Sequence, residues 1–473
     1  MQFNSLDFFW FLPVVVILYY LLPGKLRWIL LLIASYAFYM SWNAKYALLI
    51  IGSTLVDFTA AQRIYASSEK PLKKLWLSLS IVVNLGLLFS FKYYGFFRKE
   101  LATLLTEQQL ENWLPTASLL LPVGISFYTF QTLSYTIDVY RGEQKPEKHL
   151  GIFALYVSFF PQLVAGPIEK FGHLGNQLKQ TFNFSTQNLR MGGRLILYGL
   201  FIKMCVADNL SPFVDSTFEH SASASGTNLL LGAIFYAFQI YADFHGYSLI
   251  AIGAARLLGV ELINNFSTPY LATSISSFWR RWHISLTTWF REYLFIPLGG
   301  SKVYMAKWIL NVLIVFIISG LWHGDNWTFI AWGAIHGVVY LIEKLVGKAN
   351  PKLKTQNLPR IFSILGWLKT FGISVLAWIY FRSESVDEAD EYIDRMLSNS
   401  NWQTSFEFDV YGWINLALLL VFLLSDILFK NQRIDVHFET KPWVLRWAAY
   451  AILLFGIMAF GGVTLEPFIY FQF

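Results

Sequence analysis

The chain has 473 residues, of which 55% are hydrophobic and only 14% are charged, whereas a soluble domain has roughly 25% charged residues. This composition excludes an ordinary soluble domain and predicts an integral membrane protein. The formal net charge of +6 is spread over many short loops, which favours loops that face anionic lipid and argues against nucleic acid as a partner.

Apolar stretches occur from end to end of the chain, and a membrane crossing needs about 20 mostly apolar residues. We therefore predict one polytopic domain over residues 1–473 with about 11 to 13 membrane helices, since several stretches are short. The first stretch lacks a basic segment and a small-residue cleavage site, so we expect a retained helix and not a removed signal peptide. The candidate crossings are residues 8–22, 28–40, 46–60, 76–91, 118–137, 151–164, 193–206, 229–250, 309–321, 328–346, 362–381, 413–428 and 443–460.

The orientation follows from the basic residues of the short loops, because cytoplasmic loops have an excess of Lys and Arg. The first, third and fifth loops between these stretches have more basic residues than the second and fourth. We therefore expect the odd-numbered loops in the cytoplasm and the N-terminus outside the cell.

The apolar pattern breaks between residues 264 and 301, where charged residues among aromatics leave no window long enough to span. Polar backbone at membrane depth is tolerated only against protein or a water-filled cavity, so we expect re-entrant or interfacial helices here. Ser274 or Ser276 is the predicted N-cap, and residues 297–300 end the segment. Residues 383–408 are acidic and polar, which predicts a surface loop or an amphipathic helix. The charged residues of the break are Arg280, Arg281, Arg291 and Glu292.

His323 lies at the end of an apolar stretch between Gly320 and Gly324. A buried ionisable side chain in a membrane segment is costly and usually has a function, and glycine lets a second backbone or a ligand come close. Trp322 could exclude water beside it. The alternative is a structural histidine hydrogen-bonded between helices. For His336, thirteen residues further on, we expect a packing or supporting role.

His283 is the second histidine that follows a tryptophan, and it comes just after Arg280 and Arg281. These arginines are expected to lower its pKa and keep it neutral, which is the form that a general base requires. The arginines themselves are candidates to bind phosphates, or else to anchor the chain at the membrane interface.

Metal chemistry is not expected, because the usual His and Cys ligand spacings are absent from the sequence. A site with two histidines would need a carboxylate such as Asp243 or Asp325. The single cysteine, Cys205, lies in an apolar run and is expected to be buried. The sequence also lacks the G-x-S-x-G nucleophile elbow and a Gly-rich phosphate loop.

Polar side chains within apolar sequence form a further set. Each alone is most simply explained by hydrogen bonding between helices, and together they suggest an interior pore or funnel. The members are Asp57, Asn84, Gln131, Asp138, Gln162, Asp208, Gln239, Asp243 and His245.

The C-terminal tail, residues 466–473, is aromatic to its last residue, whereas a chain end is normally frayed and polar. We expect this tail to dock in a groove or at the interface, with Tyr470 as its only hydroxyl.

Several motifs closely resemble the membrane-bound O-acyltransferase family. Within that family the match is to the bacterial branch that O-acetylates extracytoplasmic polysaccharides, the alginate and peptidoglycan acetyltransferases. The matching motifs are FWRRWHISL at residues 278–286, REY at 291–293, IPLGG at 296–300, GLWHG at 320–324, LPVGISF at 121–127, IDVYRG at 137–142, DFHGYS at 243–248 and FRSES at 381–385.

The resemblance implies an all-α polytopic fold in which a ring of tilted transmembrane helices surrounds a funnel. It implies His323 as the catalytic histidine and His283 as the second functional one. It also implies transfer of acetyl groups from cytoplasmic acetyl-CoA across the bacterial inner membrane. Peptidoglycan is the expected acceptor, with alginate or another exopolysaccharide as the alternative, and a periplasmic or extracellular SGNH-type O-acetyltransferase is the expected partner. At His245 the family more often has a small residue, so His245 is either a third polar group of the tunnel or a packing variant.

The end of the tail resembles the C-terminal motif of a small partner peptide of the D-alanylation relatives, whose tyrosine is proposed to take the acyl group. Our hypothesis is that Tyr470 is a covalent acyl relay and that His323 takes its proton, because a phenol with a pKa of about 10 needs a base. The alternative is a packed aromatic tail.

Two hypotheses from other functional classes, a transporter and a non-enzymatic scaffold, remain open on the sequence. A transporter or flippase would explain the polar groups within helices, but it predicts internal repeats, and we find none in the sequence. A non-enzymatic scaffold would tolerate loss of both histidines.

Overall fold

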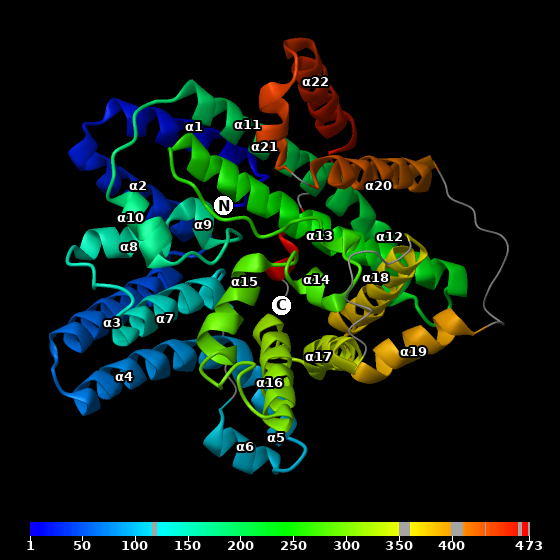
Figure 1. Cartoon of the computed structure of the whole chain (residues 1–473), viewed down its shortest axis with the longest axis horizontal. Helices are drawn as coiled ribbons and strands as arrows, with labels where there is room; N and C mark the ends of the chain where they lie inside the picture. Colours follow the sequence, from blue (N-terminus) through cyan, green and yellow to red (C-terminus); the bar gives the residue numbers. More distant parts are fainter. Residues whose placement is uncertain (116–120, 350–359, 399–409, 431, 462–465, 472–473) are drawn as a thin grey trace. The chain divides into compact units, whose positions relative to one another are not determined.

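Figure 1 shows the chain as a computed structural model, which describes residues 1–115, 121–349, 360–398, 410–430, 432–461 and 466–471. Within these residues all regular secondary structure is helical, which confirms the predicted all-α fold. They divide into two compact units, Met1–Gly193 with Ala251–Ile263 and Arg194–Ile250 with Asn264–Phe473. The single domain and the ring of helices around a funnel stay predictions.

The helices of the first unit come mainly from the N-terminal part of the chain. They are α1 (Leu6–Leu21), α2 (Gly24–Met40), η1 (Ala44–Tyr46), α3 (Ala47–Ala66), α4 (Lys70–Leu88), η2 (Phe89–Tyr93), α5 (Tyr94–Leu101), α6 (Glu107–Trp113), α7 (Ile125–Arg141), α8 (Leu150–Ser158), α9 (Phe160–Leu163), η3 (Phe171–Gly175) and α10 (Asn176–Leu178). Two helices, α11 (Thr186–Phe201) and α13 (Gly226–Leu257), have residues in both units.

The second unit contains the remaining helices and the C-terminal tail. They are η4 (Ile202–Ala207), α12 (Asp208–Glu219), η5 (Pro269–Leu271), α14 (Ile275–Trp279), α15 (Ile284–Phe290), η6 (Arg291–Phe295), α16 (Met305–His323), α17 (Trp327–Ala349), α18 (Arg360–Arg382), α19 (Val386–Leu397), α20 (Val410–Phe429), α21 (Ile434–His437), η9 (Phe438–Thr440), α22 (Trp443–Phe460) and η10 (Ile469–Phe471).

Eight helical segments of the described residues are long and apolar enough to cross a membrane, and α1 is a shorter apolar helix. The eight segments coincide with eight of the thirteen predicted crossings, so the prediction of about 11 to 13 spans was too high by this measure. The remaining stretches differ in detail: α8 and α9 are separated at Phe159, α2 is short, and α13 includes polar residues such as Gln239, Asp243 and His245. The predicted crossing 118–137 is helical from Ile125, where the short helix α7 begins, and its residues 118–120 lie outside the described residues. The eight segments are Ala44–Ala66, Lys70–Leu101, Thr186–Glu219, Met305–His323, Trp327–Ala349, Ile361–Arg382, Val410–Phe429 and Trp443–Phe460.

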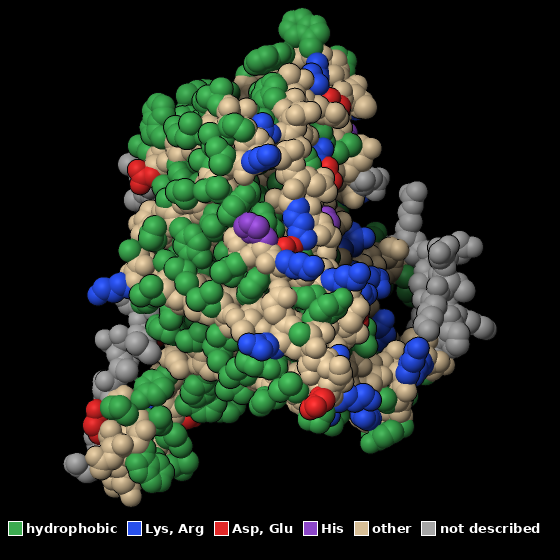
Figure 2. Space-filling model, turned by 90° about the vertical axis from the view of Figure 1, so that its left-hand side faces the viewer, with side chains coloured by type: hydrophobic (Ala, Val, Ile, Leu, Met, Phe, Trp, Pro, Cys, Tyr) green, Lys and Arg blue, Asp and Glu red, His purple; other side chains and the backbone are tan. Residues whose placement is uncertain are grey.

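Apolar side chains lie on the outside of these segments as well as inside. They cover much of the face shown in Figure 2, and α3 and α4 expose leucines and valine such as Leu48, Leu55, Leu79 and Val82. A soluble protein rarely exposes apolar surface of this extent. Together with the eight apolar segments, this surface identifies a multi-pass membrane protein.

Asp57 of α3 shows how the predicted polar set is used in the first unit. Its carboxylate accepts hydrogen bonds from Ser80 and Asn84 of α4, the latter at 2.8 Å, and from Thr136 of α7 at 3.1 Å. All four side chains are fully buried. They therefore join three neighbouring helices by hydrogen bonds, as expected for isolated polar groups in membrane segments.

Short helices replace a long one in the predicted break between residues 264 and 301. Helices η5, α14, α15 and η6 have three to seven residues each, too few to cross a bilayer. Ser274 caps α14 by accepting a hydrogen bond from the Ser277 amide at 3.1 Å, which confirms one of the two predicted caps. Gly299 and Gly300 end the segment with φ of 108° and 56°, values that glycine adopts most readily. Residues 386–397 form the predicted amphipathic helix, α19, whereas 399–409 lie outside the described residues.

Helices α16 and α17 approach each other closely because each has a glycine at their crossing. A Cβ atom on Gly320 would lie 2.2 Å from the carbonyl oxygen of Phe329, and one on Gly333 would lie 2.3 Å from the carbonyl oxygen of Phe316. Small residues allow such approach between membrane helices. Gly320 thus accommodates a second backbone, which was one of its two predicted uses.

Candidate active site

His323 is the last residue of α16 and is only 2% exposed. Its imidazole is surrounded by aromatic rings on several elements of the second unit. Measured between ring centroids, Trp322 of α16 and Trp332 of α17 each lie 5.0 Å from it. Phe381 of α18 lies 5.4 Å away, and Tyr470 of the tail lies 5.6 Å away. A histidine in such apolar surroundings is shielded from water, which strengthens its electrostatic interactions with a bound substrate.

His283 also lies near Trp322. The Trp322 ring is 5.9 Å from the imidazole of His283 and 5.0 Å from that of His323. His283 is fully buried and also contacts Phe244 of α13 at 4.7 Å. The structure therefore brings both predicted histidines to one indole, although forty residues separate them in the sequence.

The backbone at His283 is strained. With φ of 41° it is one of two described non-glycine residues with positive φ, and it is the N-cap of α15. Such strain costs about 1–3 kcal/mol and tends to occur at functional sites. Two hydrogen bonds to Asn265 stabilise the backbone directly after His283. The Asn265 carbonyl accepts the Ile284 amide at 2.9 Å, and the Asn265 side chain accepts the Ser285 hydroxyl at 2.7 Å.

Burial lowers the pKa of His283 to about 3. The predicted neutral form is therefore correct, but the predicted cause is wrong. We expected the two preceding arginines to lower this pKa, whereas Arg280 is exposed and the guanidinium of Arg281 donates to Thr268 at 3.2 Å. The pKa of His283 is low because its removal from water disfavours the charged imidazolium form.

The described part of the C-terminal tail, residues 466–471, docks within the second unit, as its aromatic composition predicts. Phe468 is fully buried and stacks on Tyr247 of α13 at 4.6 Å. The ring of Tyr470 lies 4.5 Å from Phe244 and 5.6 Å from His323. Burial raises the pKa of the Tyr470 phenol above its ordinary value of 10.0, so this hydroxyl is protonated at neutral pH and needs a base to become nucleophilic.

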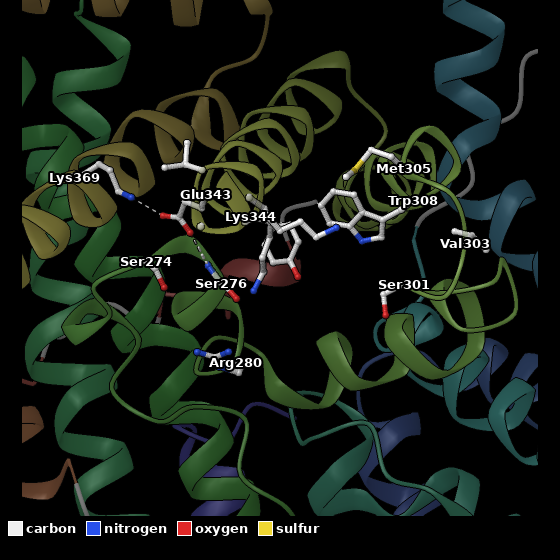
Figure 3. A pocket seen from close by; sticks show the side chains of 14 residues that line it. Ser274, Ser276, Arg280, Ser301, Val303, Met305, Trp308, Glu343, Lys344 and Lys369 are labelled. Carbon is white, nitrogen blue, oxygen red and sulfur yellow. Dashed lines mark hydrogen bonds and ion pairs between the residues drawn. The ribbon is translucent and has the colours of Figure 1, made fainter. Parts of the chain in front are cut away.

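A cavity of about 770 Å³ opens beside α14 and is lined by basic side chains (Figure 3). Glu343 of α17 accepts the backbone amides of Ile275 and Ser276 at 3.0 and 3.3 Å and pairs with Lys369 of α18 at 2.6 Å. The cavity lining therefore has one carboxylate against four basic side chains. The basic side chains are Arg280, Lys344, Lys348 and Lys369.

The two predicted donor-binding arginines have different surroundings. Arg280 lines this cavity and a second one of about 320 Å³, which also shares Ser276, Tyr340 and Lys344 with the first. Arg281 lines neither of these two cavities and bonds to Thr268 instead. An anionic ligand in the cavity would thus contact Arg280 and the lysines of α17 and α18, which sequence reasoning missed because they lie in separate helices.

Two further histidines, His336 and His245, lie against aromatic rings. His336 is fully buried and stacks on Phe278 at 5.7 Å, and it shares Trp332 with His323. His245 stacks on Tyr241 at 5.4 Å. Asp325, a carboxylate considered for a metal, is exposed. No three His, Cys, Asp or Glu side chains among the described residues lie together in a way that could bind a metal ion.

Lys203 is a charged residue near the tail that sequence reasoning missed. It is 1% exposed and pairs with Asp208 at 2.6 Å and with Asp243 at 2.5 Å, so two members of the predicted polar set meet at this lysine. A lysine in the apolar run of residues 195–206 was the signal that could have identified it, since an unpaired lysine there would be very costly.

Comparison with known proteins supports the resemblance. Residues 149–382 match the membrane-bound O-acyltransferase family. A probable alginate O-acetylase, AlgI, of Pseudomonas syringae pv. tomato is 40% identical over 86% of this chain and 77% of its own length. A peptidoglycan O-acetyltransferase of Helicobacter pylori is 32% identical over 100% of this chain and 97% of its own. A teichoic acid D-alanyltransferase of Streptococcus thermophilus is 30% identical over 56% of this chain and 69% of its own.

These matches decide between the classes that the sequence left open. A transporter or a non-enzymatic scaffold would not share such identity with acyltransferases over most of its length. The matched segment also contains both buried histidines and the basic cavity. The chain is therefore an acyltransferase and belongs to the membrane-bound O-acyltransferase family.

Proposed function

We propose that the chain transfers an acetyl group from acetyl-CoA to the hydroxyl of Tyr470, and from there to an acceptor on the outer side of the bacterial inner membrane. The observation that supports this proposal most directly is the position of Tyr470, whose ring lies 5.6 Å from that of His323 among buried aromatic side chains. A base beside a protonated hydroxyl is the arrangement that covalent acyl transfer needs.

In the first step, a ring nitrogen of His323 takes the phenol proton of Tyr470, and the phenolate oxygen attacks the thioester carbonyl carbon. The carbon–sulfur bond then breaks, and the departing thiolate takes the proton from His323. The products are O-acetyl-tyrosine and free CoA. In the second step an acceptor hydroxyl gives its proton to His323 and attacks the acetyl carbonyl carbon. The ester bond to the Tyr470 oxygen then breaks, and His323 returns the proton to the phenolate, which restores Tyr470.

We assign a supporting role to His283. Because burial lowers its pKa to about 3, it stays neutral and can donate one hydrogen bond from its protonated ring nitrogen. A neutral donor suits the oxyanion that forms on the acetyl carbonyl, since such preorganised donors supply a large part of catalysis in buried sites. Trp322 lies against both histidines and keeps water, a competing acyl acceptor, from this space.

The donor enters through the basic cavity beside α14 in this proposal. CoA carries phosphate groups, and the cavity offers Arg280 and three lysines against a single carboxylate, Glu343. Its volume of about 770 Å³ is in the range of small-molecule sites. The excess of basic residues at this end of α17 favours a cytoplasmic location for the cavity, where CoA is available. We also propose, from the charges of the first five loops and independently of the cavity, that the N-terminus lies outside.

The acceptor that we propose is an extracytoplasmic polysaccharide, reached through a periplasmic or extracellular SGNH-type O-acetyltransferase. Peptidoglycan is the first candidate, as expected from the sequence, and the Helicobacter pylori relative, a peptidoglycan O-acetyltransferase, matches along 100% of this chain. Coverage does not separate the candidates, since a probable alginate O-acetylase of Pseudomonas putida also matches along 100% of it. Alginate is the second, because the alginate O-acetylase of Pseudomonas syringae has the higher identity, 40% over 86% of the chain. Analysis of which polysaccharide loses acetyl groups when the protein is removed from its cell separates these candidates.

Mass spectrometry of the C-terminal peptide tests the relay. The purified protein is incubated with acetyl-CoA, and the peptide with Tyr470 is expected to gain the mass of one acetyl group. Tyr470→Phe should remove both this adduct and acetyl transfer. His323→Ala should lower the rate of tail acetylation by at least about 100-fold, the usual contribution of a general base. Tyr304→Phe is the matched control, since Tyr304 is 73% exposed.

Two outcomes would contradict parts of the proposal. Full acetyl transfer by Tyr470→Phe would exclude the relay, and His323 would then act directly on the final acceptor. Unchanged transfer by His323→Ala would exclude this histidine as the base.

A further inference from the structure

A buried cluster of three charged residues lies beside the tail in the second unit, and the chemistry proposed above does not use it. We call it the buried ion cluster; it consists of Lys203 of η4, Asp208 of α12 and Asp243 of α13. The side chains of Lys203 and Asp243 are 2% and 3% exposed, and that of Asp208 is 7% exposed. One ammonium group serves two carboxylates, so the cluster has a formal charge of −1.

Local structure explains how Lys203 reaches Asp243. η4 is a π-helical turn, a feature that is rare in helices and frequent at functional sites. Just before it, Gly199 lies so close to α13 that a Cβ atom there would be 2.7 Å from the carbonyl oxygen of Gly246. A Cβ atom on Gly246 would in turn be 2.8 Å from the carbonyl oxygen of Gly199. These two glycines allow α11 and α13 to pack in direct backbone contact, and Lys203, one turn after Gly199, therefore reaches Asp243.

The carboxylate of Asp243 has a different partner on each oxygen. Its Oδ1 pairs with the Nζ of Lys203 at 2.5 Å, and its Oδ2 accepts the backbone amide of Ile469 at 2.7 Å. Ile469 lies directly before Tyr470 in the tail. The lysine therefore holds one oxygen in place and orients the other toward the tail backbone, and a hydrogen bond to a charged, buried acceptor is stronger than one between neutral groups.

Aromatic contacts add to this hydrogen bond. Tyr247 follows Asp243 by one helical turn, so both lie on the same face of α13. Phe468 stacks on Tyr247 at 4.6 Å, and the rings of Phe468 and Tyr470 both contact Phe244, at 5.5 and 4.5 Å. The tail is thus held against α13 on both sides of the Ile469 amide.

We propose that the buried ion cluster is a positioning device for the tail, in which Lys203 orients Asp243 and Asp243 fixes the backbone next to Tyr470 so that its ring stays against His323. This inference rests on the proposed relay, because it gives the tail position a role in acyl transfer. Aromatic stacking alone would let the tail slide along α13, whereas a hydrogen bond to one amide sets its register. A misplacement of about 1 Å costs on the order of 100-fold in rate.

Accessibility of the tail provides a test that does not depend on catalysis. Ile469 is 6% exposed, and Cys205, the single cysteine of the chain, is fully buried. Ile469→Cys keeps the backbone amide and adds one thiol, which should react slowly with a water-soluble maleimide in the full-length protein. Asp243→Ala in this background should speed its reaction at least about tenfold, since hydrogen bonds to charged groups contribute a factor of this order or more. Asp243→Asn, which keeps the side-chain shape and leaves Lys203 paired with Asp208, should give a smaller increase.

Asp426→Ala is the matched control. Asp426 of α20 is also buried, at 6% exposed, but it accepts a hydrogen bond from the Tyr241 hydroxyl at 2.9 Å. Its removal should leave the labelling rate of the tail thiol unchanged. In the parent chain, Asp243→Ala should also lower kcat for acetyl transfer by roughly 10- to 100-fold, with the KM for acetyl-CoA unchanged.

The outcomes separate this inference from the relay itself. Equal labelling with Asp243→Ala, Asp243→Asn and Asp426→Ala would overturn the role of the cluster in holding the tail. Faster labelling with undiminished kcat would overturn its role in positioning Tyr470. Full transfer by Tyr470→Phe would instead refute the relay, while the labelling rates would still decide whether the cluster holds the tail.

Discussion

Replacing Gly320 by Ala should displace His323, because both lie in the last turn of α16. The added Cβ would be 2.2 Å from the Phe329 carbonyl oxygen, whereas an ordinary contact begins at 3.4 Å. The helices α16 and α17 must therefore separate by about 1.2 Å, since the obstructing atom is backbone and cannot rotate away. Overpacking of this kind costs about 1–3 kcal/mol, and a shift of about 1 Å at reacting groups costs on the order of 100-fold in rate.

We expect Gly320→Ala to lower kcat for acetyl transfer by about 100-fold and to lower the thermal unfolding midpoint in detergent. Gly372→Ala is the matched control, because Gly372 is a membrane-helix glycine of the same unit, in α18, with no heavy atom within 4 Å of its Cβ position. It should leave kcat unchanged and leave the midpoint unchanged or slightly higher, since alanine favours helix more than glycine does. Full activity of Gly320→Ala at an unchanged midpoint would refute the role of this helix crossing in placing His323.

Three further changes test the cavity, the buried ion cluster and the buried histidine. Arg280→Gln should raise the KM for acetyl-CoA about tenfold with a smaller effect on kcat, whereas Arg395→Gln on α19 should change neither; steady-state kinetics at two salt concentrations would check this. Lys203→Met should destabilise the fold by about 3–5 kcal/mol, because it leaves two buried carboxylates without a cation, and adding Asp208→Asn should restore part of the lost thermal midpoint. Burial lowers the pKa of His283 from 6.5 to about 3, so between pH 3 and pH 6.5 the unfolded chain binds one more proton than the folded chain. The contribution of His283 to the free energy of unfolding is therefore complete above pH 6.5 and falls by about 1.4 kcal/mol for each pH unit below 6.5. His283→Asn, which tolerates positive φ, should reduce the pH dependence of the unfolding midpoint between pH 7 and 5 without abolishing it, because His336 is also fully buried; an identical slope in the variant would show that His283 does not contribute to it.

The sequence was sufficient for the membrane class and for the identity of the candidate histidines. Long apolar runs report crossing helices directly, because the bilayer sets their length and composition. The two Trp-His motifs around His283 and His323 are likewise local, as is the aromatic end with Tyr470. Each of these signals lies within one short stretch of chain, where side-chain type and spacing are read without knowledge of distant residues.

Only the tertiary structure decided which residues meet at the site and why their chemistry is altered. Burial, which depends on every neighbouring element, lowers the pKa of His283, and the adjacent arginines do not cause it. The basic cavity draws its lining from α14, α16, α17 and α18, and the pairing of Lys203 with Asp243 joins residues forty positions apart. Charge pairing and removal from water depend on distances in space, so no pattern along the chain could have predicted that Asp243 binds the tail next to Tyr470.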